Sequence, residues 1–267
     1  MHVEATQGRR GASPPAGLTL TYVGHATVLV AMDGVRLLTD PLLRWRLGPL
    51  LRYAAPPTRE ALEPLDAILV SHAHIDHLDL RSLRRLDRSS TLVVPCGSAR
   101  TVRRLGYARV LEVEVGDRLA FGPLAVRAVP ADHLSQRYPT SRVTPSVGFV
   151  VEGSRSVYFA GDSGLFDGMA EIGPFLDVAL LPISGWGFTL PADHLNPRSA
   201  AVALQLLRPH VAVPVHWGTY FAPGLPRVWK GRDADPPYEF ARHAAKLAPH
   251  VCVRVLRPGE SLRLAGG

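Results

Sequence analysis

The sequence predicts an α/β fold in which two mixed sheets pack face to face and helices cover the outside. Short apolar runs typical of strands alternate with helical segments, and strands followed by helices recur in both halves of the chain. With 267 residues, of which 46% are hydrophobic, the chain can bury a full core. We therefore expect one domain over residues 18–267, after a flexible, polar N-terminal segment at residues 1–17.

The first strands are expected at residues 18–22, 27–32 and 35–39. Asp33-Gly34 is typical of a hairpin turn, and Asp40-Pro41 ends the third strand because proline cannot donate to the strand ladder. Residues 42–57 show no clean period and predict a long loop with at most a helical turn. The apolar residues of this loop either line a substrate mouth or pack beneath it.

The rest of the chain predicts further strands separated by helices. Ser98 is expected to cap one helix, and Asn196-Pro197 is typical of the start of another. The expected strands are residues 67–71, 91–95, 119–121, 124–129, 147–152, 156–160, 178–181, 211–215 and 251–256. The expected helices are residues 80–86, 98–105, 166–172, 196–207 and 238–247.

A cluster of imidazoles and carboxylates follows the strand at residues 67–71. In an extended segment His72 and His74 project the same way, and a turn can bring Asp76 and His77 beside them. Imidazole and carboxylate are ligands for zinc, iron and manganese, and the absence of cysteine argues against a closed structural zinc site. The cluster therefore predicts an open metal site; the alternative is a surface turn without metal.

Three more residues of metal-binding type come just past expected strands. His133 follows residues 124–130, Asp162 follows residues 157–161, and His216 follows residues 211–215. Each alone is compatible with an ordinary loop residue. A sheet can nevertheless aim all three at one rim, so we expect them to join the metal cluster.

The motif H-x-H-x-D-H at residues 72–77, with these three later residues, resembles the metallo-β-lactamase superfamily. The resemblance implies an αββα four-layer sandwich and two divalent metal ions, with zinc expected first and manganese or iron as alternatives. By this resemblance, His72, His74 and His133 would hold the first ion, and Asp76, His77 and His216 would hold the second. Asp162 would bridge the two ions.

Further segments resemble one branch of this superfamily, which contains N-acylphosphatidylethanolamine-hydrolysing phospholipase D and, more distantly, ascorbate-6-phosphate lactonase. The resemblance covers about residues 19–222. The segments that carry it include Gly24-His25-Ala26-Thr27, Leu38-Thr39-Asp40-Pro41, Phe159-Ala160-Gly161-Asp162, His194-Leu195-Asn196-Pro197 and His216-Trp217-Gly218-Thr219.

The resemblance implies roles for three residues around the metals. Asp76 would bind metal and orient the nucleophile, although a simple turn aspartate is the alternative. Asp40 would accept a hydrogen bond from a ligand histidine and fix its tautomer, or else it only begins the Asp-Pro turn. His25 would lie close to the site, unless its ring is satisfied by backbone.

Three residues are candidates for contact with substrate. His194 would contact a substrate oxygen or protonate the leaving group; otherwise it is a loop histidine beside a helix cap. Arg137 and Arg142, on the loop after His133, are candidate anion contacts, and solvated surface arginine is the alternative for both.

Composition bounds the partners and the compartment. The net charge is +7, but the arginines are scattered, so a phosphate-bearing substrate is permitted and a nucleic-acid partner is not expected. Residues 1–17 contain no apolar h-region and no run of eighteen apolar residues occurs, so we expect neither export nor a membrane span. Cys96 and Cys252 lie in apolar contexts, which predicts two buried thiols in a reducing cytoplasm. Nothing in the pattern specifies an oligomeric state.

These observations predict a dinuclear metal-dependent hydrolase that is a phosphodiesterase of the phospholipase D type. Its substrate would be a small-molecule or lipid-derived phosphodiester, attacked by a metal-activated hydroxide. Two alternatives stay open. The same hydroxide would attack carbonyl carbon in a lactonase or other acyl-ester hydrolase, and a non-catalytic, metal-stabilised interaction protein would use the metals only for structure.

Overall fold

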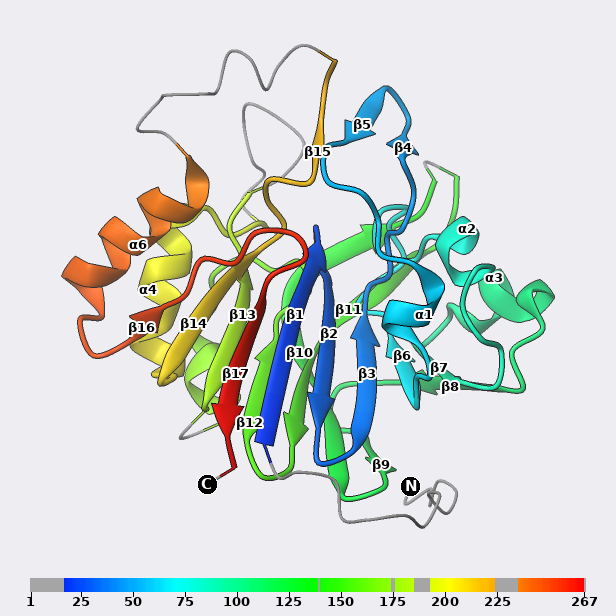
Figure 1. The fold of residues 1–267 in the computed structure, drawn as a ribbon, viewed down its shortest axis with the longest axis horizontal. Helices are drawn as coiled ribbons and strands as arrows, with labels where there is room; N and C mark the ends of the chain where they lie inside the picture. Colours follow the sequence, from blue (N-terminus) through cyan, green and yellow to red (C-terminus); the bar gives the residue numbers. More distant parts are fainter. Residues whose placement is uncertain (1–16, 139, 174–175, 185–192, 224–234, 267) are drawn as a thin grey trace.

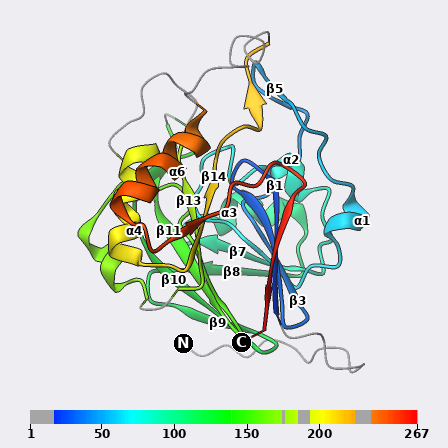
Figure 2. The ribbon, with the colours of Figure 1, turned by 60° about the vertical axis from the view of Figure 1, so that its left-hand side comes forward.

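The computed structural model describes residues 17–138, 140–173, 176–184, 193–223 and 235–266. Two seven-stranded sheets pack face to face, with helices on both outer faces (Figures 1 and 2), which confirms the predicted four-layer sandwich. The first sheet has the strand order β17 (Ser261–Ala265), β1 (Gly17–Gly24), β2 (Thr27–Met32), β3 (Val35–Thr39), β6 (Ala67–Leu69), β7 (Thr91–Pro95) and β8 (Arg109–Val113). The second has the order β16 (Cys252–Val253), β14 (Val211–Val215), β13 (Val178–Pro182), β12 (Ser156–Phe159), β11 (Val143–Glu152), β10 (Leu124–Gln136) and β9 (Arg118–Phe121).

Alternating side chains build the core between the two sheets. Successive residues of a strand point to opposite faces, so Leu18 and Leu20 of β1 meet Phe149 of β11 and Leu180 of β13 in one inner cluster. Strands deep in each sheet are buried on both faces and are therefore continuous apolar runs rather than alternating ones. The two-sided burial holds the strand ends, and hence the residues that follow them, in fixed positions.

Helices cover the outer face of each sheet. On the second sheet, α4 (Pro197–Leu207) and α6 (Pro236–Leu247) bury Leu204 and Phe240 against Tyr158 and Leu181. The first sheet is covered by three short helices, α1 (Arg59–Leu62), α2 (Leu80–Leu83) and α3 (Ala99–Val102), the last followed by the 3₁₀ turn η1 (Arg103–Leu105). A second 3₁₀ turn, η2 (Asp167–Glu171), replaces the helix expected at residues 166–172.

The start of α4 confirms the predicted cap. The Asn196 side chain accepts hydrogen bonds from the Arg198 and Ser199 backbone N–H groups, both at 3.0 Å, and the Ser199 hydroxyl accepts from Asn196 N–H at 2.8 Å. Ser98 was the other expected cap, but its side chain makes no capping hydrogen bond to α3. Its backbone is already helical, so its hydroxyl does not face the free N–H groups of the first turn.

Within residues 42–57, which were expected to form a loop with at most a helical turn, residues 46–52 form a hairpin, and the residues on either side of it are loop. Strands β4 (Arg46–Leu47) and β5 (Leu50–Arg52) pair with each other, and β5 also pairs with β15 (Tyr220–Phe221), at the top of Figure 1. The buried Arg52 anchors this small sheet by donating to the carbonyl oxygens of Leu42 and Ala54, at 2.8 and 2.9 Å. Long-range pairing to β15 stabilises these short strands, and a local pattern does not reveal such a partner.

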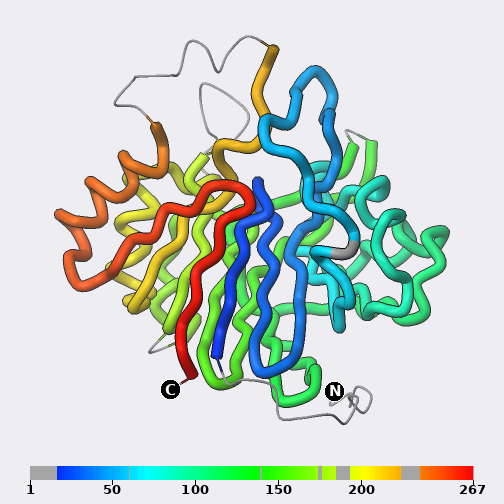
Figure 3. Tube along the Cα trace, in the orientation of Figure 1, coloured from blue at the N-terminus to red at the C-terminus, as the bar shows by residue number. Residues whose placement is uncertain are grey.

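Other boundaries also differ from the prediction. Strands β8 and β17 and helix α1 were missed, and the expected strand at residues 251–256 is reduced to β16. Residues 261–265 alternate between polar and apolar side chains, so this pattern could have predicted β17. Figure 3 shows β17 beside β1, although the two are far apart in sequence. The expected flexible segment lies outside the described residues except for Gly17, which already belongs to β1.

The two cysteines are not buried thiols as predicted. Cys96 is partly exposed. Cys252 is exposed because Val251 and Val253 pack against the core cluster beneath the helices, and the side chain between them points to the opposite face. Neither forms a disulfide. Among the helices that the structure describes, none is long and apolar enough to cross a membrane.

Candidate metal centre

The loop after β6 carries four of the predicted ligands. His74 O accepts from the N–H groups of His77 and Leu78, at 3.1 and 2.9 Å, so the chain turns at once after the extended pair. This turn brings Asp76 and His77 to the side of the loop that already holds His72. Asp79 then ends the loop by capping α2, accepting from Ser82 N–H at 2.7 Å.

The first group of predicted ligands is His72, His74 and His133, which could together hold a metal ion. His74 Nδ1 lies 3.0 Å from His72 Nε2 and 3.2 Å from His133 Nε2, so three ring nitrogens converge on one point. His133 does not follow its strand as expected but lies inside the longer β10. The register of β10 against β11 shifts between Pro130 and Leu134, and this irregularity re-aims the His133 side chain.

The second group of predicted ligands is Asp76, His77 and His216. Asp76 Oδ2 lies 3.6 Å from His77 Nε2 and 3.8 Å from His216 Nε2. His25 joins them, with its Nε2 3.1 Å from the same oxygen and its ring centroid 3.9 Å from that of His216. The imidazole of His25 therefore lies against the second group, close to the site as expected.

Asp162 lies between the two groups. Its Oδ2 is 3.2 Å from His77 Nε2 and 3.9 Å from His72 Nε2, and its Oδ1 is 3.5 Å from His216 Nε2. Burial alone would raise the pKa of Asp162, but the imidazoles of His216 and His77 lower it well below its usual value. Asp162 is thus a buried carboxylate within reach of imidazoles from both groups.

The donor set fits metal ions. Asp162 Oδ1 and His77 Nε2 are buried and make no hydrogen bond within the described residues, an arrangement that is costly unless a ligand completes it. Histidine nitrogens and carboxylate oxygens, with no thiolate among them, suit zinc, manganese or iron in an open site.

Asp40 lies where its predicted role requires. It is fully buried at the end of β3, and its Oδ2 accepts a hydrogen bond from His77 Nδ1–H at 2.7 Å. Burial alone would lower the pKa of His77, but the carboxylates of Asp162, Asp76 and Asp40 raise it well above its usual value. Asp40 thus holds the His77 ring with Nε2 directed to the site.

His194 lies at the mouth of the site, next to a residue that the sequence reasoning missed. The two oxygens of Asp193 lie 3.0 Å from His133 Nδ1 and 3.1 Å from His194 Nδ1, so one carboxylate orients both rings. His194 Nε2 is 3.5 Å from Asp162 Oδ2, and this contact raises the pKa of His194. The signal for Asp193 was its place directly before a candidate histidine.

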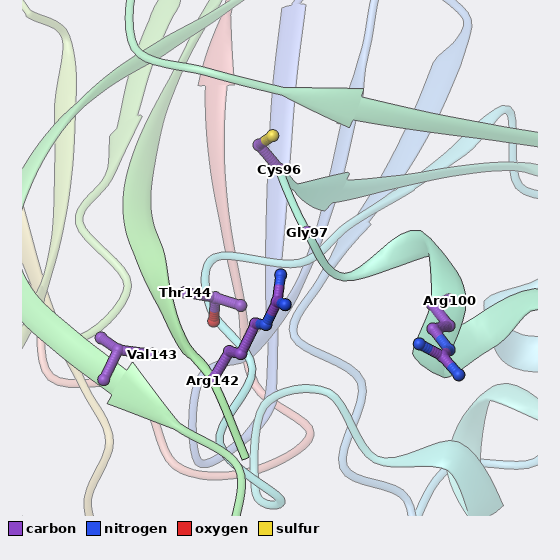
Figure 4. Close-up of a pocket in the computed structure, with 6 residues that line it drawn as sticks. All are labelled: Cys96, Gly97, Arg100, Arg142, Val143 and Thr144. Carbon is purple, nitrogen blue, oxygen red and sulfur yellow. The ribbon is translucent and has the colours of Figure 1, made fainter.

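The two candidate anion contacts are separate from the histidine cluster. Arg137 Nη1 donates to the carbonyl oxygens of Ala73 and Leu78, at 3.0 and 2.8 Å, and so holds the ligand loop from outside. Arg142 is exposed and lines a pocket of about 410 Å³ (Figure 4). The other residues of this pocket are Cys96, Gly97, Arg100, Val143 and Thr144.

Known proteins share this architecture. A family model described as a β-lactamase superfamily domain matches residues 35–217. A metal-dependent hydrolase of Methanopyrus kandleri is 35% identical, over 91% of this chain and 99% of its own length. An N-acyl-phosphatidylethanolamine-hydrolyzing phospholipase D of Caenorhabditis elegans is 32% identical, over 77% of this chain and 65% of its own. The solved structure of a metallo hydrolase from Ignicoccus hospitalis superposes with a TM-score of 0.68 at 26% identity, over 93% of this chain and 99% of its own.

The chain belongs to the metallo-β-lactamase superfamily. Within it, the chain is a metal-dependent hydrolase with the branch resemblance that the sequence indicated.

Proposed function

We propose that the protein binds two divalent metal ions and hydrolyses a phosphodiester. The observation that carries the proposal is the placement of Asp162 between two groups of ligand atoms, 3.2 Å from His77 and 3.9 Å from His72. In this proposal His72, His74 and His133 hold one ion, and Asp76, His77 and His216 hold the other. Zinc is the expected ion, with manganese and iron as alternatives.

Two bound divalent cations would lower the pKa of water to supply hydroxide and would stabilise negative charge that develops on the substrate. The chain's own groups do the rest. Asp76 is held by His25 and directs its Oδ2 into the second group, where it orients the nucleophile. His194 is only partly exposed, and Asp193 and Asp162 favour its protonated form, so it can give a proton to the leaving group at the mouth of the site.

A phosphodiester is the proposed substrate class because it carries a full negative charge and gains more in the transition state. A centre with two cations stabilises that charge more than the smaller charge on a neutral lactone. The identity to a nematode phospholipase D over 77% of this chain supports the same choice. The proposed substrate is therefore a small-molecule or lipid-derived phosphodiester.

The test uses one zinc-loaded preparation and two classes of substrate. Bis(p-nitrophenyl) phosphate should be hydrolysed with a higher kcat/KM than p-nitrophenyl acetate or simple lactones, and inorganic phosphate should compete. A preference for lactones of about tenfold or more, without inhibition by phosphate, would instead support a lactonase; tenfold is a transition-state difference of about 1.4 kcal/mol. Full metal occupancy without activity on either class would favour a metal-stabilised interaction protein.

We further propose that residues 18–267 act as one domain in the cytoplasm. Two free cysteines, one of them exposed, are consistent with a reducing compartment. Osmotic fractionation of the native cells, with detection of the protein by antibody, tests the compartment.

A further inference from the structure

A chain of hydrogen bonds runs behind the two ligand groups. Asp40 Oδ2 accepts from His77 Nδ1–H at 2.7 Å and from the Ser71 hydroxyl at 2.6 Å, while Asp40 Oδ1 accepts from Ser71 N–H at 2.7 Å. The Ser71 hydroxyl oxygen lies 2.9 Å from His72 Nδ1. One buried carboxylate is thus connected to a histidine of each ligand group, directly to His77 and through Ser71 to His72.

The chemistry of these groups fixes where the protons lie. A carboxylate only accepts, so the single hydroxyl proton of Ser71 points to Asp40. The Ser71 oxygen must then accept from His72 Nδ1–H. His72 and His77 therefore both carry a proton on Nδ1, and the Nε2 atom of each faces the ligand cluster, 3.0 Å from His74 and 3.2 Å from Asp162 respectively.

Packing leaves this chain little freedom. Asp40 and Ser71 are 0% and 1% exposed. The Asp40 backbone has a φ of 33° and is held at both sides, because Asp40 N–H donates to Leu69 at 2.9 Å and its carbonyl accepts from the Thr27 hydroxyl at 2.7 Å. Gly161 closes over Ser71, where an added Cβ would lie only 2.5 Å from Ser71 Cβ. The serine hydroxyl is thereby confined between Asp40 and His72.

We propose that Ser71 is a positioning residue that extends the effect of the Asp40 carboxylate from the second ligand group to His72 of the first. Asp40 sets the tautomer of one ligand in each group, directly for the second ion and through the Ser71 hydroxyl for the first. This inference rests on the proposed two-metal centre. It predicts that Ser71 controls only the first ion, whereas Asp40 controls both.

Zinc affinity separates these two effects. Ser71→Ala removes only the hydroxyl, so affinity for the first ion should fall about 10- to 100-fold while the second is unchanged. Asp40→Asn should weaken both, because it removes the negative charge and its NH₂ group faces donors in either orientation: the Ser71 hydroxyl and His77 Nδ1–H, or Ser71 N–H. Competition titration with a chelator gives both affinities, and anomalous diffraction at limiting zinc assigns each to its group.

Ser163→Ala is the matched control. Ser163 is also fully buried and lies beside a proposed ligand, but its hydroxyl bonds only to backbone, donating to Gly164 O and accepting from Asp132 N–H. Removing the Ser163 hydroxyl should lower the free energy of unfolding without weakening one zinc ion relative to the other. Equal zinc affinities in Ser71→Ala and in the wild type, or equal loss at both ions, would overturn the role of Ser71 as a positioning residue for the first ion.

Nitrogen-15 NMR of the zinc-loaded wild type tests the same claim without any variant. His72 and His77 should both show a protonated Nδ1 and a zinc-bound Nε2. The opposite tautomer at His72 would overturn the relay while leaving a two-zinc centre intact. A wild type that binds no zinc would overturn the proposed centre, and the relay with it.

Discussion

The two sheets supply the metal centre in different ways. The first sheet provides a single loop, in which residues 72–77 hold four of the proposed ligands and the turn is closed by hydrogen bonds to His74 O. The second sheet provides three proposed ligands one at a time: His133 within β10, Asp162 after β12 and His216 after β14. One half of the site is therefore local in sequence, and the other half exists only when the sheet has its correct register.

The backbone shows how the second half is aimed. His133 lies at a register irregularity in β10, Asp162 follows Gly161 with a φ of 63°, and His216 itself has a φ of 62°. A positive φ is uncommon for a residue other than glycine and is held only by surrounding structure. His216 N–H donates to His25 O at 2.7 Å, so a residue in the turn between β1 and β2 of the first sheet holds it in place.

The largest expected effect comes from removing the residue that joins the halves. Asp162→Asn should lower the occupancy of both ions, because a bridging carboxylate contributes charge to each, and activity should fall more than about 100-fold. His216→Ala should mainly empty the second site. Metal analysis with anomalous scattering measures both; equal loss of both ions in His216→Ala, with Asp162→Asn harmless, would contradict the assignment.

The His194→Ala variant tests whether the part of the site next to the second sheet also contributes a residue that takes part in the reaction. His194→Ala should leave metal content unchanged and lower kcat by about 10²-fold, as expected when a positioned proton donor is removed. His243→Ala is the control, because His243 lies on α6 and contacts Glu239 instead of the site. A fully active His194→Ala variant would assign His194 to the loop alone.

The smallest expected effect concerns a contact between two turns, one from each sheet. Asp33, in the turn between β2 and β3, accepts from the N–H and the hydroxyl of Ser154, both at 2.6 Å, in the turn between β11 and β12. Asp33→Asn keeps a residue that tolerates the φ of 51° and should lower the free energy of unfolding by about 1 kcal/mol. Metal content should not change, and urea unfolding measures the loss.

The same pair makes a pH prediction. Burial opposes ionisation, but the bonds from Ser154 lower the pKa of Asp33 below its usual value. Because its pKa is lower in the folded state, ionised Asp33 stabilises the fold at pH values above its unfolded-state pKa of about 3.9. This stabilisation is lost as the pH falls through the folded-state pKa. The stability gap between wild type and Asp33→Asn should therefore narrow below about pH 4. A gap independent of pH between 3 and 6 would contradict it.

Sequence reasoning predicted the local half of the site best. The H-x-H-x-D-H spacing places His72, His74, Asp76 and His77 without knowledge of the sheet, and apolar runs of strand length gave most of the strands. The family resemblance supplied the order of the later ligands. His133 was expected past its strand because a bulge leaves no pattern that distinguishes it from a strand end.

Contacts between distant segments were the part that could not be predicted. The hairpin of β4 and β5 depends on β15, about 170 residues later, and on the buried Arg52. Asp193 contacts His133, which is sixty residues away in the sequence. The Ser71 hydroxyl is held in place only because Asp40 and Gly161 pack around it. Such partners follow from packing, which local propensity does not encode.

The central claim is that both halves of the site together bind two metal ions. Elemental analysis of protein purified without chelator and then saturated with zinc tests it most directly, with anomalous diffraction to locate the ions. We predict two ions per chain, one beside His72, His74 and His133 and one beside Asp76, His77 and His216, with Asp162 between them. A single well-occupied ion, with no second ion accepted under excess zinc, would contradict it.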